Sequence, residues 1–319
     1  MIYFIYGEDS YRAKRKLEEI ILGYKKIHQS GLNLIYINAN ENDFRDFYGN
    51  LKTNSMFAEK KLIILKNVFS DAKFQEEFLE NIKNLEDVKD IVIIYEDCLP
   101  DQRTKFFKAL SGSARSREAR QIKCQEFNFL QPAMLKKWVI GKFNENGAKI
   151  NPDALDLLVS SVGSDLWQMA NEINKLSNYK KGGVVRKEDV ELLVKPNIEN
   201  DIFTTIDALA SKEKRQALSL LHKHLENGDS PLYLLSMISY QFRNLLIIKE
   251  LMEKRNPYAA IAKKSGLHPF VVQKSYYLCN QFSMEQLKKI YHKIFQADSD
   301  IKTGKVEAET ALDLLIAEI

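Results

Sequence analysis

The sequence has few residues that break regular structure or build metal sites. Its 319 residues include only 13 glycines and 7 prolines, which leaves little room for long loops. The three cysteines, Cys98, Cys124 and Cys279, have no paired spacing, which excludes a cysteine-based zinc ribbon and a disulfide framework. The five histidines form no metal-binding motif either. We therefore expect no metal site, and the scattered cysteines indicate a reducing compartment.

Long apolar runs are also absent. No stretch reaches the roughly 18 residues that a membrane-spanning helix needs. No signal peptide is visible before the first predicted strand. Hydrophobic residues nevertheless make up 45% of the chain, enough for a substantial core. We expect a cytoplasmic protein of about two or three domains, with no membrane partner.

The turn after the first predicted strand lacks the residues of a phosphate-binding loop. The apolar run 2–6 leads into residues 7–15, which read GEDSYRAKR. A working loop needs a glycine-rich turn, a lysine for the phosphates and a serine or threonine for Mg²⁺. This turn has one glycine, and the carboxylates of Glu8 and Asp9 stand where phosphate would lie. It indicates a nucleotide-binding scaffold that binds no nucleotide there, and an ordinary strand–turn–helix unit is the alternative.

Motifs for catalysis are scarce. The fourth predicted strand ends in Tyr95-Glu96-Asp97, where an ATPase places the acids that hold Mg²⁺ and polarise water. Without a phosphate loop these acids have nothing to act on, and strand-end carboxylates are common helix caps. No serine-nucleophile motif, His-Glu-x-x-His motif or Cys/His pair suggests another reaction. The sequence predicts no intrinsic catalysis and no cofactor.

Two periodicities divide the chain. In the first third, short β-branched and aromatic runs alternate with helical patterns, which predicts a parallel, doubly wound α/β sheet. After about residue 128 only helical patterns follow. Lys195-Pro196-Asn197 looks like a linker, because helices tend to end before proline. The predicted strands cover residues 2–6, 34–37, 62–65, 91–95 and 122–127.

The positive charge is uneven. Residues 101–142 hold ten lysines and arginines against three acids, a net charge of +7, whereas the whole chain carries only +4. Such a patch suits a phosphate backbone or an acidic partner. Taken alone, it is more often a solvated face.

Two large apolar residues, Met56 and Phe57, stand in a polar stretch that begins with Asn54 and Ser55, directly before the third predicted strand. Loop tips rarely carry such a pair without a partner for it. The pair either packs back on the core or enters a pocket of another protein.

Four later strings of residues occur in the order and spacing of a known family. They are NEINKL (171–176), ENDIFTTIDAL (199–209), YQFRNLL (240–246) and ADSDIKTG (297–304). Together with the opening Tyr-Gly-Glu-Asp, they resemble the delta subunit of the bacterial DNA polymerase III clamp loader. The resemblance covers essentially the whole chain.

The resemblance implies a chain of AAA+ type with three domains. These would be a RecA-like α/β domain at 1–128, a small helical lid domain at 129–196 and a helical collar domain at 197–319, in agreement with the two periodicities. It implies a subunit without ATPase activity in a DNA polymerase III holoenzyme, whose DNA-directed DNA polymerase activity lies in the complex. Its partners would be the delta-prime and gamma/tau subunits, joined through the collar, and enclosed primer-template DNA. Alone, the chain is expected to be monomeric.

The resemblance also implies a clamp-binding site. The family's clamp-binding element maps onto Asn54, Ser55, Met56 and Phe57, with Phe57 as the main anchor. Met56 stands where leucine is more familiar, and Lys52 stands near a position that glutamine often occupies. The implied function is to bind the beta sliding clamp, hold one of its interfaces open and help to load it on primed DNA.

Two further assignments follow from the resemblance. Arg243 lies on an otherwise apolar helical pattern and could pair with a collar neighbour or with Asp207. Candidates to face the enclosed DNA are Arg103, Arg115, Arg117 and Arg120.

Two other readings of the whole chain remain. One is an active P-loop NTPase with an unusual loop, which would have to bind nucleotide. The other is a nucleic-acid-binding module without a clamp, which predicts steep salt dependence of DNA binding.

Overall fold

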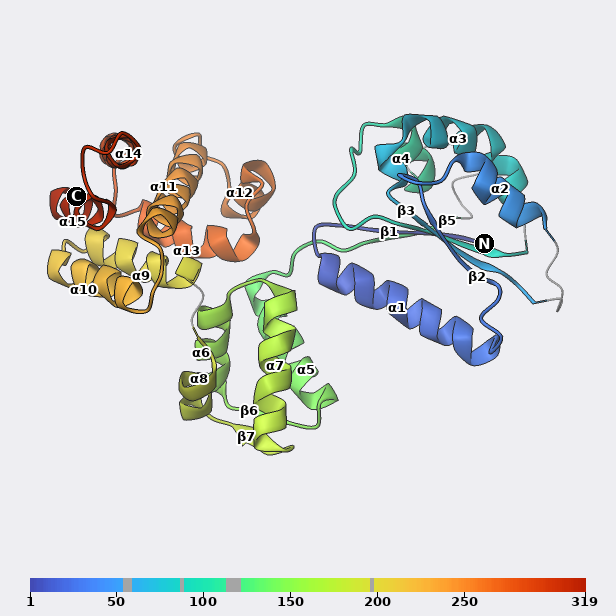
Figure 1. Cartoon of the computed structure of the whole chain (residues 1–319), viewed down its shortest axis with the longest axis horizontal. Helices are drawn as coiled ribbons and strands as arrows, with labels where there is room; N and C mark the ends of the chain where they lie inside the picture. The colour runs from blue at the N-terminus through green and yellow to red at the C-terminus, as the bar shows by residue number, and fades with distance from the viewer. Residues whose placement is uncertain (54–58, 87–88, 113–121, 196–197) are drawn as a thin grey trace. The chain divides into compact units, whose positions relative to one another are not determined.

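A computed structural model gives the fold (Figure 1) and describes residues 1–53, 59–86, 89–112, 122–195 and 198–319. The chain divides into two compact units, Met1–Phe129 and Leu130–Ile319. The finer division into three domains, with a boundary near residue 196, stays a prediction. Within the described parts of the chain, no helix has the length and apolar character needed to cross a membrane.

The first unit is built on a parallel five-stranded sheet with the strand order β2-β3-β4-β1-β5. Leu62, Ile63, Ile64 and Leu65 of the inner strand β3 are all fully buried. This burial explains the unbroken apolar run, because inner strands of a doubly wound sheet are covered on both faces. All five predicted strands are confirmed: β1 (Ile2–Tyr6), β2 (Leu34–Asn38), β3 (Leu62–Lys66), β4 (Ile91–Tyr95) and β5 (Ile122–Glu126).

Helices cover both faces of this sheet, as Figure 1 shows. On one face, Leu17 and Tyr24 of α1 belong to a core that includes Ile64 and Ile93. On the other face, α2, α3 and α4 bury a cluster of phenylalanines that includes Phe78. The layers confirm the predicted doubly wound arrangement. The helices of this unit are α1 (Ser10–Ile27), α2 (Phe44–Lys52), the 3₁₀ helix η1 (Val68–Ser70), α3 (Ala72–Glu86) and α4 (Lys105–Leu110).

The second unit begins with four helices and a small two-stranded parallel sheet, in which β6 pairs with β7. The sequence did not predict this pairing, because two-residue strands carry no periodicity. Asp165 caps α7 by accepting hydrogen bonds from the backbone N–H groups of Trp167 and Gln168. The elements are α5 (Pro132–Glu145), β6 (Lys149–Ile150), α6 (Pro152–Val162), α7 (Leu166–Lys180), β7 (Val184–Val185) and α8 (Lys187–Leu193).

The rest of the second unit is helical and shares one core. Ile238, Phe242 and Leu245 of α11 lie in this core with side chains from the surrounding helices. α14 ends at Lys302, and Gly304 then takes a positive φ of 72° and turns the chain into α15. The helices are α9 (Ile198–Ala210), α10 (Lys214–Glu226), α11 (Pro231–Glu253), α12 (Tyr258–Ser265), α13 (Pro269–Cys279), α14 (Met284–Lys302) and α15 (Ala308–Glu318). An α/β unit followed by a mainly helical one is the predicted fold class.

Candidate functional site

The turn between β1 and α1 is occupied by the chain's own groups. Asp9 is the N-cap of α1, and its carboxylate accepts hydrogen bonds from the backbone N–H of Arg12 at 3.0 Å and from Arg12 Nη1 at 3.2 Å. The backbone N–H groups of Gly7 and Asp9 donate to the carbonyl oxygens of Cys98 and Phe127. Burial raises the pKa of Asp9, and the bonds from Arg12 oppose this rise. The helix N-terminus that could attract a phosphate is therefore already capped by a carboxylate.

The glycine in this turn has a packing role. Gly7 has a φ of 145°, and a Cβ added there would lie 2.2 Å from the carbonyl oxygen of Phe127. Only a residue without a side chain allows the end of β1 to approach Phe127 this closely. Arg12 connects the start of α1 with the chain after β5. Its guanidinium lies 5.5 Å from the centre of the Phe127 ring and donates a hydrogen bond to the carbonyl oxygen of Asn128.

The acid at the end of β4 also has a structural partner. Glu96 is 3% exposed, and its Oε1 accepts a hydrogen bond from the backbone N–H of Phe69 at 3.2 Å, in η1. Burial raises its pKa to about 7, against the opposing backbone hydrogen bonds from Phe69 and Val68. Glu96 thus holds the short helix η1 in place, in agreement with the capping role considered from the sequence.

The predicted clamp-binding residues Asn54, Ser55, Met56 and Phe57 lie outside the described residues. The structure does describe the chain on either side of them, at the end of α2 and the start of β3. We call Thr53, Glu59, Lys60 and Lys61 together the anchor, because each is fixed by hydrogen bonds to other parts of the unit.

Lys61 joins the two sides of the anchor. Its side chain is buried, and Nζ donates hydrogen bonds to the carbonyl oxygen of Asn50 at 2.5 Å, to Oγ1 of Thr53 at 2.8 Å and to the carbonyl oxygen of Thr53. These carbonyls belong to the last turn and C-cap of α2, where a cation is also favoured by the helix dipole. The backbone N–H of Lys61 donates to Oδ1 of Asp90 at 2.8 Å. One buried side chain therefore connects the end of α2 with the start of β3.

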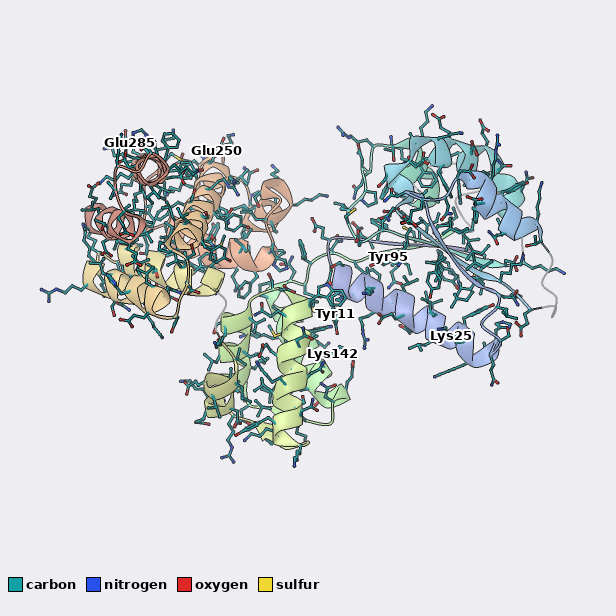
Figure 2. All side chains as sticks on the ribbon, viewed as in Figure 1. Tyr11, Lys25, Tyr95, Lys142, Glu250 and Glu285 are labelled. Atoms are coloured by element: carbon teal, nitrogen blue, oxygen red, sulfur yellow. The ribbon has the colours of Figure 1, made fainter. Side chains whose placement is uncertain are left out.

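Glu59 and Lys60 are tied to the connection between α1 and β2. Glu59 Oε2 accepts hydrogen bonds from Ser30 Oγ at 3.0 Å and from Asn33 Nδ2 at 2.9 Å. The buried phenol of Tyr24 donates to the carbonyl oxygen of Lys60 at 2.6 Å. Burial raises the pKa of Tyr24, so the phenol keeps the proton that it donates. Tyr24 lies in the last turn of α1, next to Lys25, which Figure 2 labels.

Two exposed apolar side chains border the anchor. Ile27 is 78% exposed and Leu32 is 72% exposed. Ile27 precedes His28, whose Nδ1 lies 3.9 Å from Glu59 Oε1, and Leu32 precedes Asn33, which binds Glu59 directly. Single exposed apolar residues are ordinary, and what distinguishes these two is that each is next in sequence to a residue that contacts Glu59. Sequence reasoning missed both the anchor and this border.

The predicted DNA-facing arginines are described only at Arg103. Its guanidinium pairs with the carboxylate of Asp101 at 2.9 Å, and these hydrogen bonds lower the pKa of Asp101 to about 2. Both side chains are exposed. The ion pair reduces the positive charge that Arg103 offers to a phosphate, and its role stays a prediction. Arg115, Arg117 and Arg120 lie outside the described residues.

Two sequence models of one family match most of the chain. The model described as "DNA polymerase III, delta subunit" matches residues 3–125. The model described as "DNA polymerase III delta subunit, C-terminal domain" matches residues 199–319. The first match lies in the α/β unit, and the second covers the helices from α9 onward. The two matches therefore follow each other in the order of domains that the resemblance implied.

Individual proteins agree with the family match. The chain is similar to DNA polymerase III subunit delta of Bacillus subtilis, at 24% identity, over 100% of this chain and 92% of that protein. It is also 24% identical to a probable DNA polymerase III subunit delta of Aquifex aeolicus, over 93% of this chain and 85% of the other. Its fold is similar to the solved DNA clamp loader delta protein of Bacillus subtilis, with a TM-score of 0.76 and 22% identity, over 99% of this chain and 94% of that one. The fold class, a parallel-sheet α/β unit followed by a mainly helical one, is as predicted.

Proposed function

The chain belongs to the DNA polymerase III delta subunit family, and we propose that it binds the sliding clamp through residues 54–57. It holds one clamp interface open and helps to load the clamp on primed DNA in the cytoplasm. Its other partners are the delta-prime and gamma/tau subunits, with primer-template DNA inside the complex. It catalyses no reaction itself and contributes to the activity of the polymerase complex.

The observation that carries this proposal is the anchor. Thr53 is the C-cap of α2, Glu59 lies three residues before β3, and both residues are hydrogen-bonded to the body of the unit. A loop with fixed ends presents its side chains at a lower entropic cost on binding than a loop with free ends. The segment between these points contains the pair Met56 and Phe57.

The mechanism needs binding energy and no chemistry. A subunit that binds an opened clamp interface more tightly than a closed one shifts the clamp toward the open form. Each tenfold difference in affinity between the two forms contributes about 1.4 kcal/mol to this shift. Asp9 caps the helix N-terminus at which a nucleotide phosphate would bind. This supports a subunit that binds no ATP itself and responds to the ATP state of its neighbours.

The test is clamp binding by the purified chain without nucleotide. Wild type and the double variant Met56→Ala/Phe57→Ala are titrated with the cognate clamp by calorimetry. Truncation of a buried aromatic anchor typically costs about 2–4 kcal/mol, so we expect affinity to fall by about 30- to 1,000-fold. Leu192→Ala on α8 is the matched control, because Leu192 is an exposed apolar residue of the other unit. Circular dichroism checks that each variant is folded.

Each outcome has a distinct meaning. If the double variant binds as well as wild type, residues 56 and 57 are not the site. If wild type does not bind its cognate clamp at all, the clamp-opening function itself fails. DNA binding by the isolated chain with steep salt dependence would then favour the nucleic-acid-binding module.

A further inference from the structure

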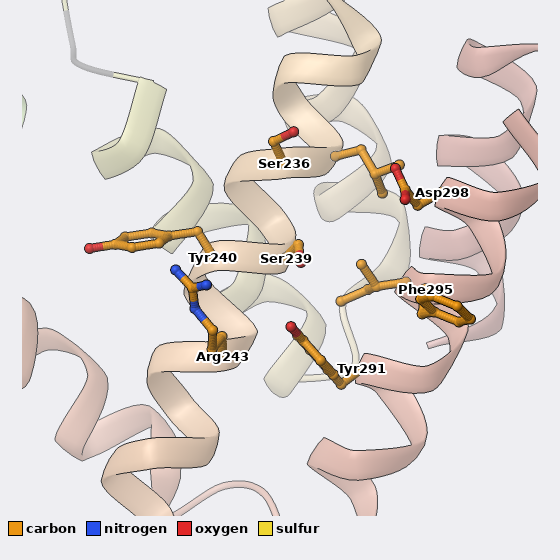
Figure 3. A pocket seen from close by; sticks show the side chains of 9 residues that line it. Ser236, Ser239, Tyr240, Arg243, Tyr291, Phe295 and Asp298 are labelled. Atoms are coloured by element: carbon orange, nitrogen blue, oxygen red, sulfur yellow. The ribbon is translucent and has the colours of Figure 1, made fainter. Parts of the chain in front are cut away.

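The string YQFRNLL on α11 carries polar side chains on two faces of the helix. Tyr240 and Arg243 are three residues apart and share one face, and Gln241 and Asn244 share another. Figure 3 shows Tyr240 and Arg243 beside a hollow between α11 and α14, and the Arg243 guanidinium lies 5.4 Å from the centre of the Tyr240 ring. Among the described residues Arg243 forms no ion pair, so Asp207, considered from the sequence, is not its partner. Arg243 is exposed, whereas Gln241 and Asn244 are buried.

The polar groups of the inner face are enclosed almost completely. Gln241 and Asn244 are each 1% exposed, and Ser275 on α13 is 0% exposed. Within the described parts of the chain, Gln241 Oε1, Asn244 Nδ2 and Ser275 Oγ have no hydrogen-bond partner. Folded proteins satisfy the great majority of their buried polar atoms, because a hydrogen bond lost in the interior is not replaced by bulk water. These three atoms therefore require a partner.

The three side chains belong to helix faces that meet. α13 packs against α11, and Cys279 Sγ on α13 donates a hydrogen bond to the carbonyl oxygen of Leu245 on α11 at 3.4 Å. Ser275 lies one turn before Cys279, and Gln241 lies one turn before Leu245. Asn244 directly precedes Leu245. The polar groups thus surround the point at which the two helices touch.

The chemistry of the three groups fits a single water molecule. Gln241 Oε1 only accepts hydrogen bonds, Asn244 Nδ2 only donates them, and the Ser275 hydroxyl can do both. A buried water typically makes about three hydrogen bonds. The amide and hydroxyl groups carry no charge that would hold an ion, and their burial leaves no opening for a larger ligand.

We propose that Gln241, Asn244 and Ser275 hold an ordered water molecule inside the helical core, where it bridges α11 and α13. The water donates to Gln241 Oε1 and accepts from Asn244 Nδ2, and the Ser275 hydroxyl supplies its third hydrogen bond. Because the water is bonded to both helices, it fixes the register of α13 on α11. The site gives a physical role to two polar residues of a string that carries the family resemblance, and it does not depend on clamp binding.

High-resolution crystallography of the full chain tests the site directly. We expect electron density for one water within about 2.7–3.2 Å of Gln241 Oε1, Asn244 Nδ2 and Ser275 Oγ. Hydrogen bonds made directly between the three side chains, with no water among them, would overturn the inference. So would a dry contact between α11 and α13 at these residues.

Urea unfolding of two variants gives a second test. Asn244→Leu keeps a similar shape but removes the donor, and Ser275→Ala removes the hydroxyl. If the water is bound, each substitution leaves it short of a partner, and we expect the equilibrium constant for unfolding to rise at least about fivefold. Ser236→Ala is the matched control, because Ser236 is an exposed serine of α11 whose hydroxyl bonds to the carbonyl oxygen of Leu232 in the same helix.

The sign of the Asn244→Leu effect is decisive. An amide without any partner would destabilise the wild type, so its removal would make the protein more stable. An Asn244→Leu variant as stable as wild type, or more stable, would therefore contradict the bound water. Equal losses in Ser275→Ala and Ser236→Ala would also contradict it.

Discussion

The side-chain nitrogen of Lys61 lies 2.5 Å from the carbonyl oxygen of Asn50. The residue that precedes β3 thus holds the last turn of α2, although 11 positions separate the two residues in the chain. Lys61 is only 4% exposed, so backbone carbonyl oxygens take the place of water as hydrogen-bond acceptors for its side-chain nitrogen. The hydrogen bond joins the two sides of the segment that contains Met56 and Phe57.

Replacing Lys61 by methionine should destabilise the first unit and weaken clamp binding. The substitution keeps the apolar stem but leaves the carbonyl groups of Asn50 and Thr53 without their donor, at a cost of about 1–3 kcal/mol in the free energy of unfolding. Urea denaturation measures the stability, and calorimetry measures clamp affinity where the variant is fully folded. Lys60→Met is the matched control, because the Lys60 side chain is exposed and only its backbone carbonyl is used. Equal effects of the two substitutions would contradict the role given to Lys61.

The double substitution Ile27→Ser/Leu32→Ser should weaken clamp binding with little effect on stability. Both side chains are largely exposed, so their replacement should change the free energy of unfolding by less than about 0.5 kcal/mol each. If the clamp covers this border, affinity should fall by about tenfold, or about 1.4 kcal/mol. Leu192→Ser is the control, because Leu192 is an exposed apolar residue of the other unit. Unchanged affinity would limit the contact to residues 54–58.

Gly7→Ala should be strongly destabilising, whereas Gly23→Ala should be stabilising. At Gly7 the added Cβ meets the Phe127 carbonyl at 2.2 Å and the backbone has a positive φ, so we expect a loss of about 3 kcal/mol or more. At Gly23, within α1, the added Cβ meets nothing within 4 Å, and alanine should gain about 0.5–1 kcal/mol through its higher helix propensity. Urea unfolding of the two variants checks both signs. A Gly7→Ala protein as stable as wild type would show that the turn can shift.

Glu96 should make stability fall as the pH rises. Its folded-state pKa is raised to about 7 from an ordinary value of 4.5, so the folded state binds the proton more tightly than the unfolded state. The stabilising contribution of the protonated form is complete below pH 4.5 and is lost as the pH approaches about 7. Relative to Glu96→Gln, which cannot titrate, wild type should lose about 2–3 kcal/mol of unfolding free energy across this range.

Unfolding of both proteins in urea at several pH values measures this difference. Glu285→Gln on α14 shows how much a change from glutamate to glutamine contributes at an exposed position. Parallel pH profiles for wild type and Glu96→Gln would contradict the burial of a titrating carboxyl at this position.

Local patterns in the sequence predicted the elements well, and the exceptions have local causes. The start of α4 at Lys105 is set locally, because Thr104 caps the helix by accepting a hydrogen bond from the backbone N–H of Phe107. The β6–β7 pair and η1 were missed because elements of two or three residues show no periodicity. The long helices and buried strands were found because each repeats its pattern over several residues.

The sequence by itself determined the fold class, the order of the elements and the family, since each depends on residue types at regular spacing. Only the tertiary structure decided what surrounds the candidate site. The anchor joins Lys61 to Asn50 and Tyr24 to Lys60, and the latter pair is separated by 36 positions. The partner of Arg243 is another example, because a carboxylate of this chain can pair with Arg243 only where the packing of the helices brings the two side chains together. Hydrogen bonds and ion pairs act over a few ångströms, so residue order alone could not predict them.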